Sequence, residues 1–237
     1  FLEIPNRGLR SRTTSQPSVG DFQKVFRELT ANGDEVLCLT ISSKMSGTYL
    51  AAKAAAETLP QARIHVYDSQ HVSVALGQLA LRVAQEAAAG RSLPELLAIL
   101  DQMTRSYGIV FLVDSLEFLH KGGRIGTASA LVGTLLSVKP LLTIKDGVIQ
   151  PLNSVRSKKS AQERMLALLE AQVPAGTPIW GAVAHGDNPI DAEWLAGQVR
   201  MRYDCKALYV AEMGPVVGTH VGPGIVGAAI FPMLSGQ

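Results

Sequence analysis

Short apolar runs alternate with stretches of helical periodicity along the first half of the chain. Three apolar runs predict buried strands, at residues 35–42, 62–69 and 108–113. Apolar residues recur at helical spacing before and between these runs, at residues 21–29, 46–59, 74–89 and from Ser92 onward. Strands that alternate with helices of ten or more residues are typical of βαβ units. The pattern therefore predicts an α/β protein with a largely parallel sheet.

The rhythm changes near residue 140. Two extended runs flank Asp146-Gly147, a dipeptide typical of a hairpin turn. Helices are then expected at residues 157–172 and 189–203, with strands at 178–185, 207–213 and 225–231. We therefore expect two domains, an N-terminal α/β domain at residues 1–139 and a smaller α/β domain at residues 140–237.

Composition narrows the class of protein. Of the 237 residues, 47% are hydrophobic and 18% are charged, which excludes a disordered chain. The net charge of +2 comes from scattered residues, so we expect no binding to nucleic acid or to an anionic membrane. The sequence has no apolar run of about 18 residues and no basic-then-apolar start, so we expect a cytoplasmic protein without a transmembrane segment. Cys38 and Cys205 are expected to be buried free thiols.

Familiar catalytic and cofactor motifs are missing from the sequence or stand in the wrong context. Gly222–Gly227 has the letters of a dinucleotide fingerprint, but the residues after it are expected to form a strand, with no room for the acidic ribose contact. No Gly-x-Ser-x-Gly turn supplies a hydrolase nucleophile, and the five histidines show no metal-ligand spacing. We therefore expect neither a metal nor another cofactor.

Two hydroxyl-rich turns stand where α/β proteins build binding sites. Residues 13–18 precede a predicted helix, and residues 42–49 join the end of a predicted strand to the start of a helix. Hydroxyls and free backbone N–H groups at such positions favour anions. Each hydroxyl could instead be a simple helix cap. Arg156 and His220, which stand in further turns, favour the anion site.

Five short motifs follow one another along the chain: Thr14–Ser18 (TSQPS), Ser42–Tyr49 (SSKMSGTY), Val113–Gly126 (VDSLEFLHKGGRIG), Ser154–Ala161 (SVRSKKSA) and His220–Gly227 (HVGPGIVG). In this order they resemble the successive signatures of the DegV family of bacterial fatty-acid-binding proteins. The resemblance spans residues 14–227. It implies the two-domain DegV fold, with a lipid site between the domains.

The resemblance also implies which residues bind the ligand. A long-chain fatty acid would lie in an apolar tunnel, with its carboxylate held by Thr14, Ser46, Arg156 and His220. Two hydroxyls and an imidazole would supply neutral donors, and the arginine would supply compensating charge. The neighbouring residues that would complete the site are Ser15, Gly47, Thr48 and Gly222.

A carrier is implied rather than an enzyme. The FakB-type subunits of this family present an acyl chain to a separate fatty-acid kinase, which makes the acyl phosphate for phospholipid synthesis. We expect this chain to be such a non-catalytic subunit, a monomer without a cofactor. Lys121 and Arg124, in the KGGRIG turn, are candidates for docking the kinase, although that turn could instead be purely structural.

The start of the chain departs from the family pattern. Members usually begin with a strand that ends in an Asp-Ser-Thr or Asp-Ser-Ser turn, several dozen residues before the TSQPS motif. This chain begins 13 residues before Thr14. The given N-terminal domain therefore lacks the family's first strand, either because the sequence is a truncated piece or because the protein has no such strand. In the second case an element of the sheet and one wall of the binding site would be lost.

Two other functions stay open at this point. A serine-type hydrolase of a small ester would use Ser46 and His220. A sugar-phosphate or nucleotide-binding module would use the turn Gly222–Gly227. The mean hydropathy of +0.18 favours the carrier, because aliphatic residues beyond those of a core could line an acyl tunnel.

Overall fold

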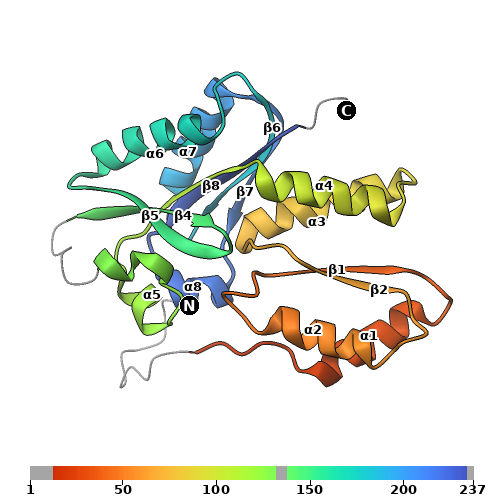
Figure 1. Cartoon of the computed structure of the whole chain (residues 1–237). Coiled ribbons are helices and arrows are strands. Elements are labelled where there is room, and N and C mark those ends of the chain that lie inside the picture. Colours follow the sequence, from red (N-terminus) through yellow and green to blue (C-terminus); the bar gives the residue numbers. More distant parts are fainter. Residues whose placement is uncertain (1–12, 132–137, 234–237) are drawn as a thin grey trace. The chain divides into compact units, whose positions relative to one another are not determined.

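A computed structural model describes residues 13–131 and 138–233 (Figure 1). The chain divides into two compact units. The β1–β2 unit comprises Ser15–Arg105 and Asp146–Val148. Among the described residues, the six-stranded unit comprises 13–14, 106–131, 138–145 and 149–233. Both units contain strands and helices, so the predicted α/β class is confirmed.

The β1–β2 unit is built on two parallel strands. β1 (Val36–Thr40) pairs with β2 (Ile64–Asp68) along its full length. Helices cover both faces of this pair (Figure 1), with α1 (Val19–Thr30) and α2 (Thr48–Glu57) on one side and α3 (Ser73–Ala88) and α4 (Leu93–Arg105) on the other. Phe26 of α1 and Ala52 and Ala55 of α2 form a buried apolar core on that side. This part of the chain follows the predicted alternation of strands and helices.

Local sequence signals set the starts of two of these helices. Ser18 and Asp21 form a capping box before α1, in which each side chain accepts from the other's backbone N–H. Ser92 and Glu95 make a similar contact before α4, where the backbone N and Oγ of Ser92 donate to the Glu95 carboxylate at 2.8 and 2.7 Å. α4 therefore begins where the sequence predicts, and α1 begins two residues before the predicted range 21–29.

The strands of the other unit form one mixed sheet, in the order β5-β4-β3-β8-β6-β7. Their bounds are β3 Gly108–Leu112, β4 Lys139–Lys145, β5 Val148–Val155, β6 Pro178–His185, β7 Asp204–Glu212 and β8 Val226–Pro232. β6 and β7 run parallel, whereas β8 is antiparallel to both β3 and β6. The expected hairpin is present, with β4 next to β5 in the sheet and the Asp146-Gly147 turn between them.

β3 differs from its prediction. The pattern of the first half predicts that this strand extends a largely parallel sheet, but it pairs antiparallel with both β4 and β8. All five residues of β3 are buried, and a continuous apolar run is typical of any central strand. The sequence therefore reveals that the strand is central without revealing its partners. Because β3 pairs with β4 and β8, it belongs to the six-stranded unit. The boundary between the two units therefore falls after Arg105, before β3, and not after residue 139.

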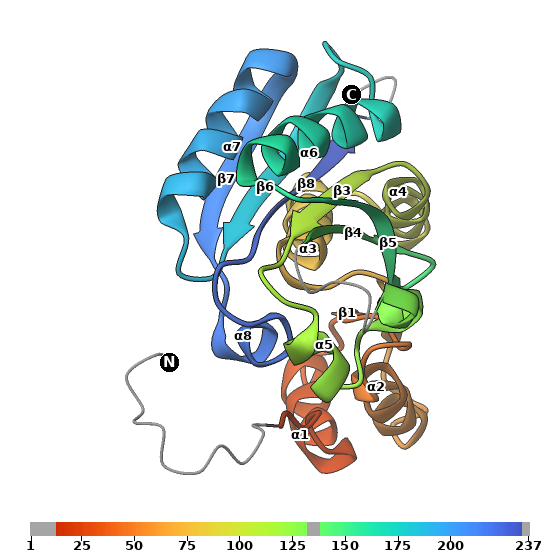
Figure 2. The same cartoon turned by 90° about the vertical axis from the view of Figure 1, so that its left-hand side faces the viewer.

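Two long helices cover one face of the six-stranded sheet, α6 (Lys158–Gln172) and α7 (Pro189–Arg202) (Figure 2). Met165 and Leu169 of α6 and Leu195 of α7 belong to the core of this unit and are almost fully buried. Three shorter helices complete the unit, α5 (Glu117–Lys121), a 3₁₀ helix (Gly126–Leu131) and α8 (Pro215–Val221).

Two expectations from composition can be compared with the structure. Cys38 and Cys205 are free thiols and partly buried, and burial raises the pKa of each. Within residues 13–131 and 138–233, no helix combines the length and the apolar character needed to span a bilayer.

Close packing of β8 on β3 gives a first prediction. A Cβ at Gly227 would come within 2.5 Å of the Cβ of Phe111, its partner across the two strands. Gly227→Ala should therefore separate the strands and lower the free energy of unfolding by about 1–3 kcal/mol in urea titrations. Gly197 in α7 has open space at its Cβ position, so Gly197→Ala should be neutral or stabilise by up to about 1 kcal/mol. Equal effects of the two variants would contradict the close packing at Gly227.

Candidate functional site

Thr14 and His220 meet in the six-stranded unit, although 206 positions separate them along the chain. Thr14 Oγ1 lies 2.8 Å from His220 Nε2, and the tautomer of the imidazole decides which atom donates. His220 belongs to the last turn of α8, and Thr14 is half-buried. Two of the residues predicted to bind a carboxylate are therefore in hydrogen-bond contact.

The other nitrogen of the His220 ring faces the turn after α5. His220 Nδ1 is buried, and a Cβ at Gly122 would come within 2.4 Å of it. Gly222, directly after α8, has φ +74°, and a Cβ there would come within 2.4 Å of the Phe118 ring. Glycine at both positions lets α5 and α8 pack closely (Figure 2). This packing holds the imidazole in place beside Thr14.

The surroundings of His220 favour its neutral form. Burial lowers the pKa of His220, and the nearby positive charge of Arg124 lowers it further. Arg124 Nη1 donates to the carbonyl oxygen of Gly122 at 2.8 Å, which holds the guanidinium on the same turn. A neutral imidazole carries one donor and one acceptor, so Nε2 can either donate to the Thr14 hydroxyl or accept from it.

Two other predicted residues of this unit lie at the surface. Lys121 forms an ion pair with Glu117, one turn earlier in α5, and both side chains are exposed. Arg156 is exposed in the turn between β5 and α6, and no hydrogen bond or ion pair of its side chain occurs within the described ranges. The role of Arg156 at the carboxylate and that of Lys121 in docking stay predictions.

Ser46, Gly47 and Thr48 lie in the β1–β2 unit, at the start of α2. Ser46 Oγ is 2.9 Å from Thr48 Oγ1 and accepts from the Thr48 backbone N–H at 3.3 Å. The side chain of Gln16 covers Gly47, since a Cβ there would come within 2.6 Å of Gln16 Nε2. Ser15 is exposed. The start of α2 therefore brings together two hydroxyls, both predicted for the site.

Helix capping explains only part of the hydroxyl-rich turns. Ser18 does cap α1. The N-cap residue of α2 is Gly47, which has no side chain, and Ser43 bonds instead to Asp68 at the end of β2. Sequence reasoning missed Asp68. Asp68 could have been found as an acidic residue at the end of a predicted strand. The neighbouring strand, β1, is followed by the hydroxyl-rich turn at residues 42–49.

The contacts of His220 do not support the hydrolase alternative. A serine-type hydrolase needs an imidazole beside its nucleophile and a third group that orients the imidazole. The hydroxyl beside His220 is that of Thr14, and Nδ1 has no hydrogen-bond partner in the described part of the chain. Within that same part, no cluster of three or more metal-ligating side chains exists.

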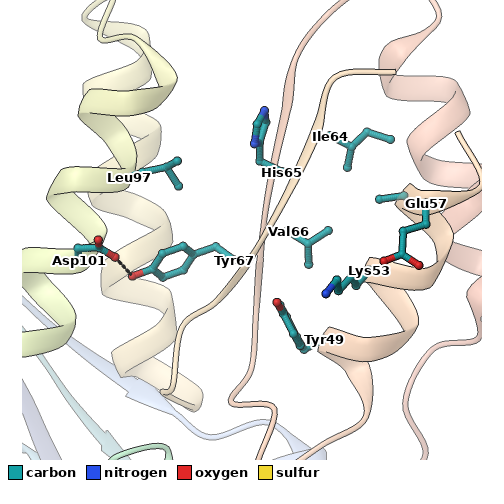
Figure 3. Close-up of a pocket in the computed structure, with 10 residues that line it drawn as sticks. Tyr49, Lys53, Glu57, Ile64, His65, Val66, Tyr67, Leu97 and Asp101 are labelled. Carbon is teal, nitrogen blue, oxygen red and sulfur yellow. Dashed lines mark hydrogen bonds between the residues drawn. The ribbon is translucent and has the colours of Figure 1, made fainter. Parts of the chain in front are cut away.

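A separate hollow of about 560 Å³ lies beside β2 in the β1–β2 unit (Figure 3). Side chains of α2, β2 and α4 line it, among them Tyr49, Tyr67 and Asp101. The Tyr67 hydroxyl donates to the Asp101 carboxylate at 2.9 Å, and burial raises the pKa of Tyr67 to about 12. None of the residues predicted to bind a carboxylate lines this hollow.

The chain is similar to proteins of one family. Residues 5–233 match the family model for DegV, whose description is "Uncharacterised protein, DegV family". Protein DegV of Bacillus subtilis is 34% identical over 96% of this chain and 81% of its own length. A fatty acid-binding protein of Thermotoga maritima is 35% identical over 92% of this chain and 76% of its own.

A solved structure gives the same result. The DegV family protein of Thermus thermophilus, described as fatty-acid binding, superposes with a TM-score of 0.88 at 38% identity. The superposition covers 93% of this chain and 79% of that one. The chain therefore belongs to the DegV family, and its mixed α/β architecture matches that of DegV fatty-acid-binding structures.

His71, in the loop after β2, is a buried histidine whose burial can be tested. Its side chain is only 1% exposed, and burial lowers its pKa from 6.5 to about 4. The folded protein therefore holds His71 neutral where the unfolded chain would protonate it. The free energy of unfolding is therefore highest above pH 6.5. It falls as the pH drops to about 4, because over this range only the unfolded chain takes up the proton.

We predict that the stability difference between the wild type and His71→Gln depends on pH. Unfolding titrations at pH 7 and pH 4 should show this difference shrinking by about 3 kcal/mol at the lower pH. Gln85→Ala, at an exposed position on α3, changes no titratable group and should keep the wild-type pH profile. A wild-type pH profile in His71→Gln would contradict the burial of a neutral imidazole.

Proposed function

We propose that the protein binds a long-chain fatty acid with its carboxylate at Thr14 and His220. The observation that carries this proposal is the hydrogen bond between these two side chains, which come from opposite ends of the chain. Each lies in a motif of the DegV family. The fatty-acid binding of the relatives from Thermotoga maritima and Thermus thermophilus supports the same ligand class.

The chemistry of the head group fits this pair. A carboxylate that leaves water needs several hydrogen-bond donors. If the neutral imidazole donates from Nε2 to Thr14 Oγ1, the threonine hydroxyl is free to donate to a carboxylate oxygen. Arg124, close enough to lower the pKa of His220, supplies positive charge at the same place. We propose that Ser46 and Arg156 complete the donor set.

The acyl tail requires an apolar tunnel. At roughly 0.8 kcal/mol per buried methylene, a long chain contributes on the order of 10 kcal/mol before ordering costs. This is enough for tight retention without a covalent bond. The aliphatic composition, with 47% hydrophobic and only 5% aromatic residues, supports a lining of this kind.

In this proposal the protein is a non-catalytic, monomeric carrier. A separate fatty-acid kinase transfers the terminal phosphoryl group of ATP to the bound carboxylate, which yields an acyl phosphate and ADP. Phospholipid synthesis then consumes the acyl phosphate. Because ATP supplies the phosphoryl group, the proposal locates the protein in the cytoplasm. Lys121 and Arg124, near the head-group residue His220, are the proposed docking side chains for the kinase.

Loss of either head-group side chain should weaken binding. Thr14→Ala removes the hydroxyl proposed to donate to the charged carboxylate, and His220→Ala removes the bond that orients this hydroxyl, so we expect the affinity for palmitic acid to fall about 10- to 100-fold in each variant. The measurement is calorimetric titration of delipidated protein, with circular dichroism to show that both variants stay folded.

Two variants serve as matched controls for this prediction. Thr219→Ala changes a neighbouring, partly buried threonine whose hydroxyl bonds within α8, and His120→Ala changes an exposed histidine of α5. Both should bind palmitic acid with wild-type affinity. Unchanged affinity in both Thr14→Ala and His220→Ala would mean that the head-group site lies elsewhere.

A further inference from the structure

The loop Ser42–Gly47 leads from β1 to α2 and carries Ser46, a proposed carboxylate ligand. Ser42 is its first residue and is completely buried. Ser42 Oγ donates to the carbonyl oxygen of Gly147 at 2.7 Å, and Ser42 N donates to the carbonyl oxygen of His71 at 3.0 Å. One end of the loop is thus bonded to two other segments of the β1–β2 unit.

Ser42 also organises the loop itself. Its carbonyl oxygen accepts from Met45 N at 3.0 Å and from Ser46 N at 3.1 Å. Its hydroxyl oxygen accepts from Lys44 N at 3.3 Å. The backbone of Ser46 is therefore bonded directly to a residue that is anchored on its other side.

A second anchor lies one residue further along. The Asp68 carboxylate accepts from the backbone N–H of Ser43 at 3.1 Å and from the Ser43 hydroxyl at 2.5 Å. The same carboxylate accepts from Gln70 N at 3.1 Å. Asp68 therefore ties the loop after β1 to the loop after β2. Bonds to a charged acceptor are about twice as strong as neutral ones, so this anchor is a firm one.

These anchors bear on the hydroxyl of Ser46. Ser46 Oγ and Thr48 Oγ1 are 2.9 Å apart, and either atom can donate. When Thr48 donates, the Ser46 proton is free for a ligand, and the hydrogen bond that Ser46 accepts strengthens the one that it donates. The strength of such a bond depends on a well-defined position of the oxygen, which the two anchors provide.

We propose that Ser42, Ser43 and Asp68 are positioning residues that hold Ser46 for the carboxylate of the fatty acid. The proposal rests on the proposed function and concerns the head group alone. A merely structural role would change the affinity for every ligand with the same tail. A positioning role changes the affinity for the carboxylate and spares an uncharged head group.

The test compares two ligands that share one tail. Palmitic acid and cetyl alcohol are titrated into delipidated wild-type protein, Ser42→Ala and Ser43→Ala. We expect each variant to bind the acid about tenfold more weakly and to bind the alcohol within about twofold of the wild type. Ser92→Ala, the same substitution at the cap of α4, should change neither affinity.

The outcomes separate this proposal from the proposed function. A wild type that binds no palmitic acid would overturn the proposed function itself. A wild type that binds, with equal losses for acid and alcohol in the variants or with no loss, would overturn the positioning role alone. Ser42 is buried, so Ser42→Ala could fail to fold. Ser43→Ala removes one hydroxyl at a partly exposed position, and its result then decides the question.

Discussion

A carboxylate can leave water only where the protein has already arranged hydrogen-bond donors and positive charge to receive it. In the proposed head-group site this arrangement depends on the bond between Thr14 and His220. That bond depends in turn on the close packing of α8 against α5. Gly122 and Gly222 permit this packing, because a Cβ at either position would overlap the side chain that lies against it. Two residues without side chains thus permit the packing that holds the His220 imidazole.

In the β1–β2 unit, hydrogen bonds within the protein likewise fix the position of polar groups, here hydroxyls in place of an imidazole. Its hydroxyls stand in a loop that is tied down at Ser42 and Ser43 before it reaches Ser46. A hydroxyl is a weak partner for an anion when it moves freely, since ordering it opposes binding. Hydrogen bonds made before the ligand arrives reduce that cost. The buried Ser42 and the acidic Asp68 therefore affect the ligand without touching it.

Much of the fold could be predicted from local signals in the sequence. The capping residues before α1 and α4, the Asp146-Gly147 turn and the apolar runs of the strands all reflect interactions between residues close in sequence. The partners of β3 could not be predicted, because a strand buried on both faces looks the same in either kind of sheet. Strand pairing is decided by residues far away in the chain.

Only part of the candidate site could be predicted from the sequence. Motif order pointed to Thr14 and His220, which are in contact, and to Ser46 and Thr48, which also bond to each other. Asp68 was missed because its role arises only when β1 and β2 lie side by side. Arg156 is exposed, and its proposed contact would form only with a ligand present.

We propose that the protein binds a fatty acid without converting it chemically. Native mass spectrometry tests this binding most directly. Protein purified from a bacterial host without detergent is measured intact, and the bound lipid is then released and identified. The account predicts an added mass equal to one long-chain fatty acid, recovered unmodified after extraction. Protein that carries no fatty acid and takes none up when palmitic acid is added would contradict the account.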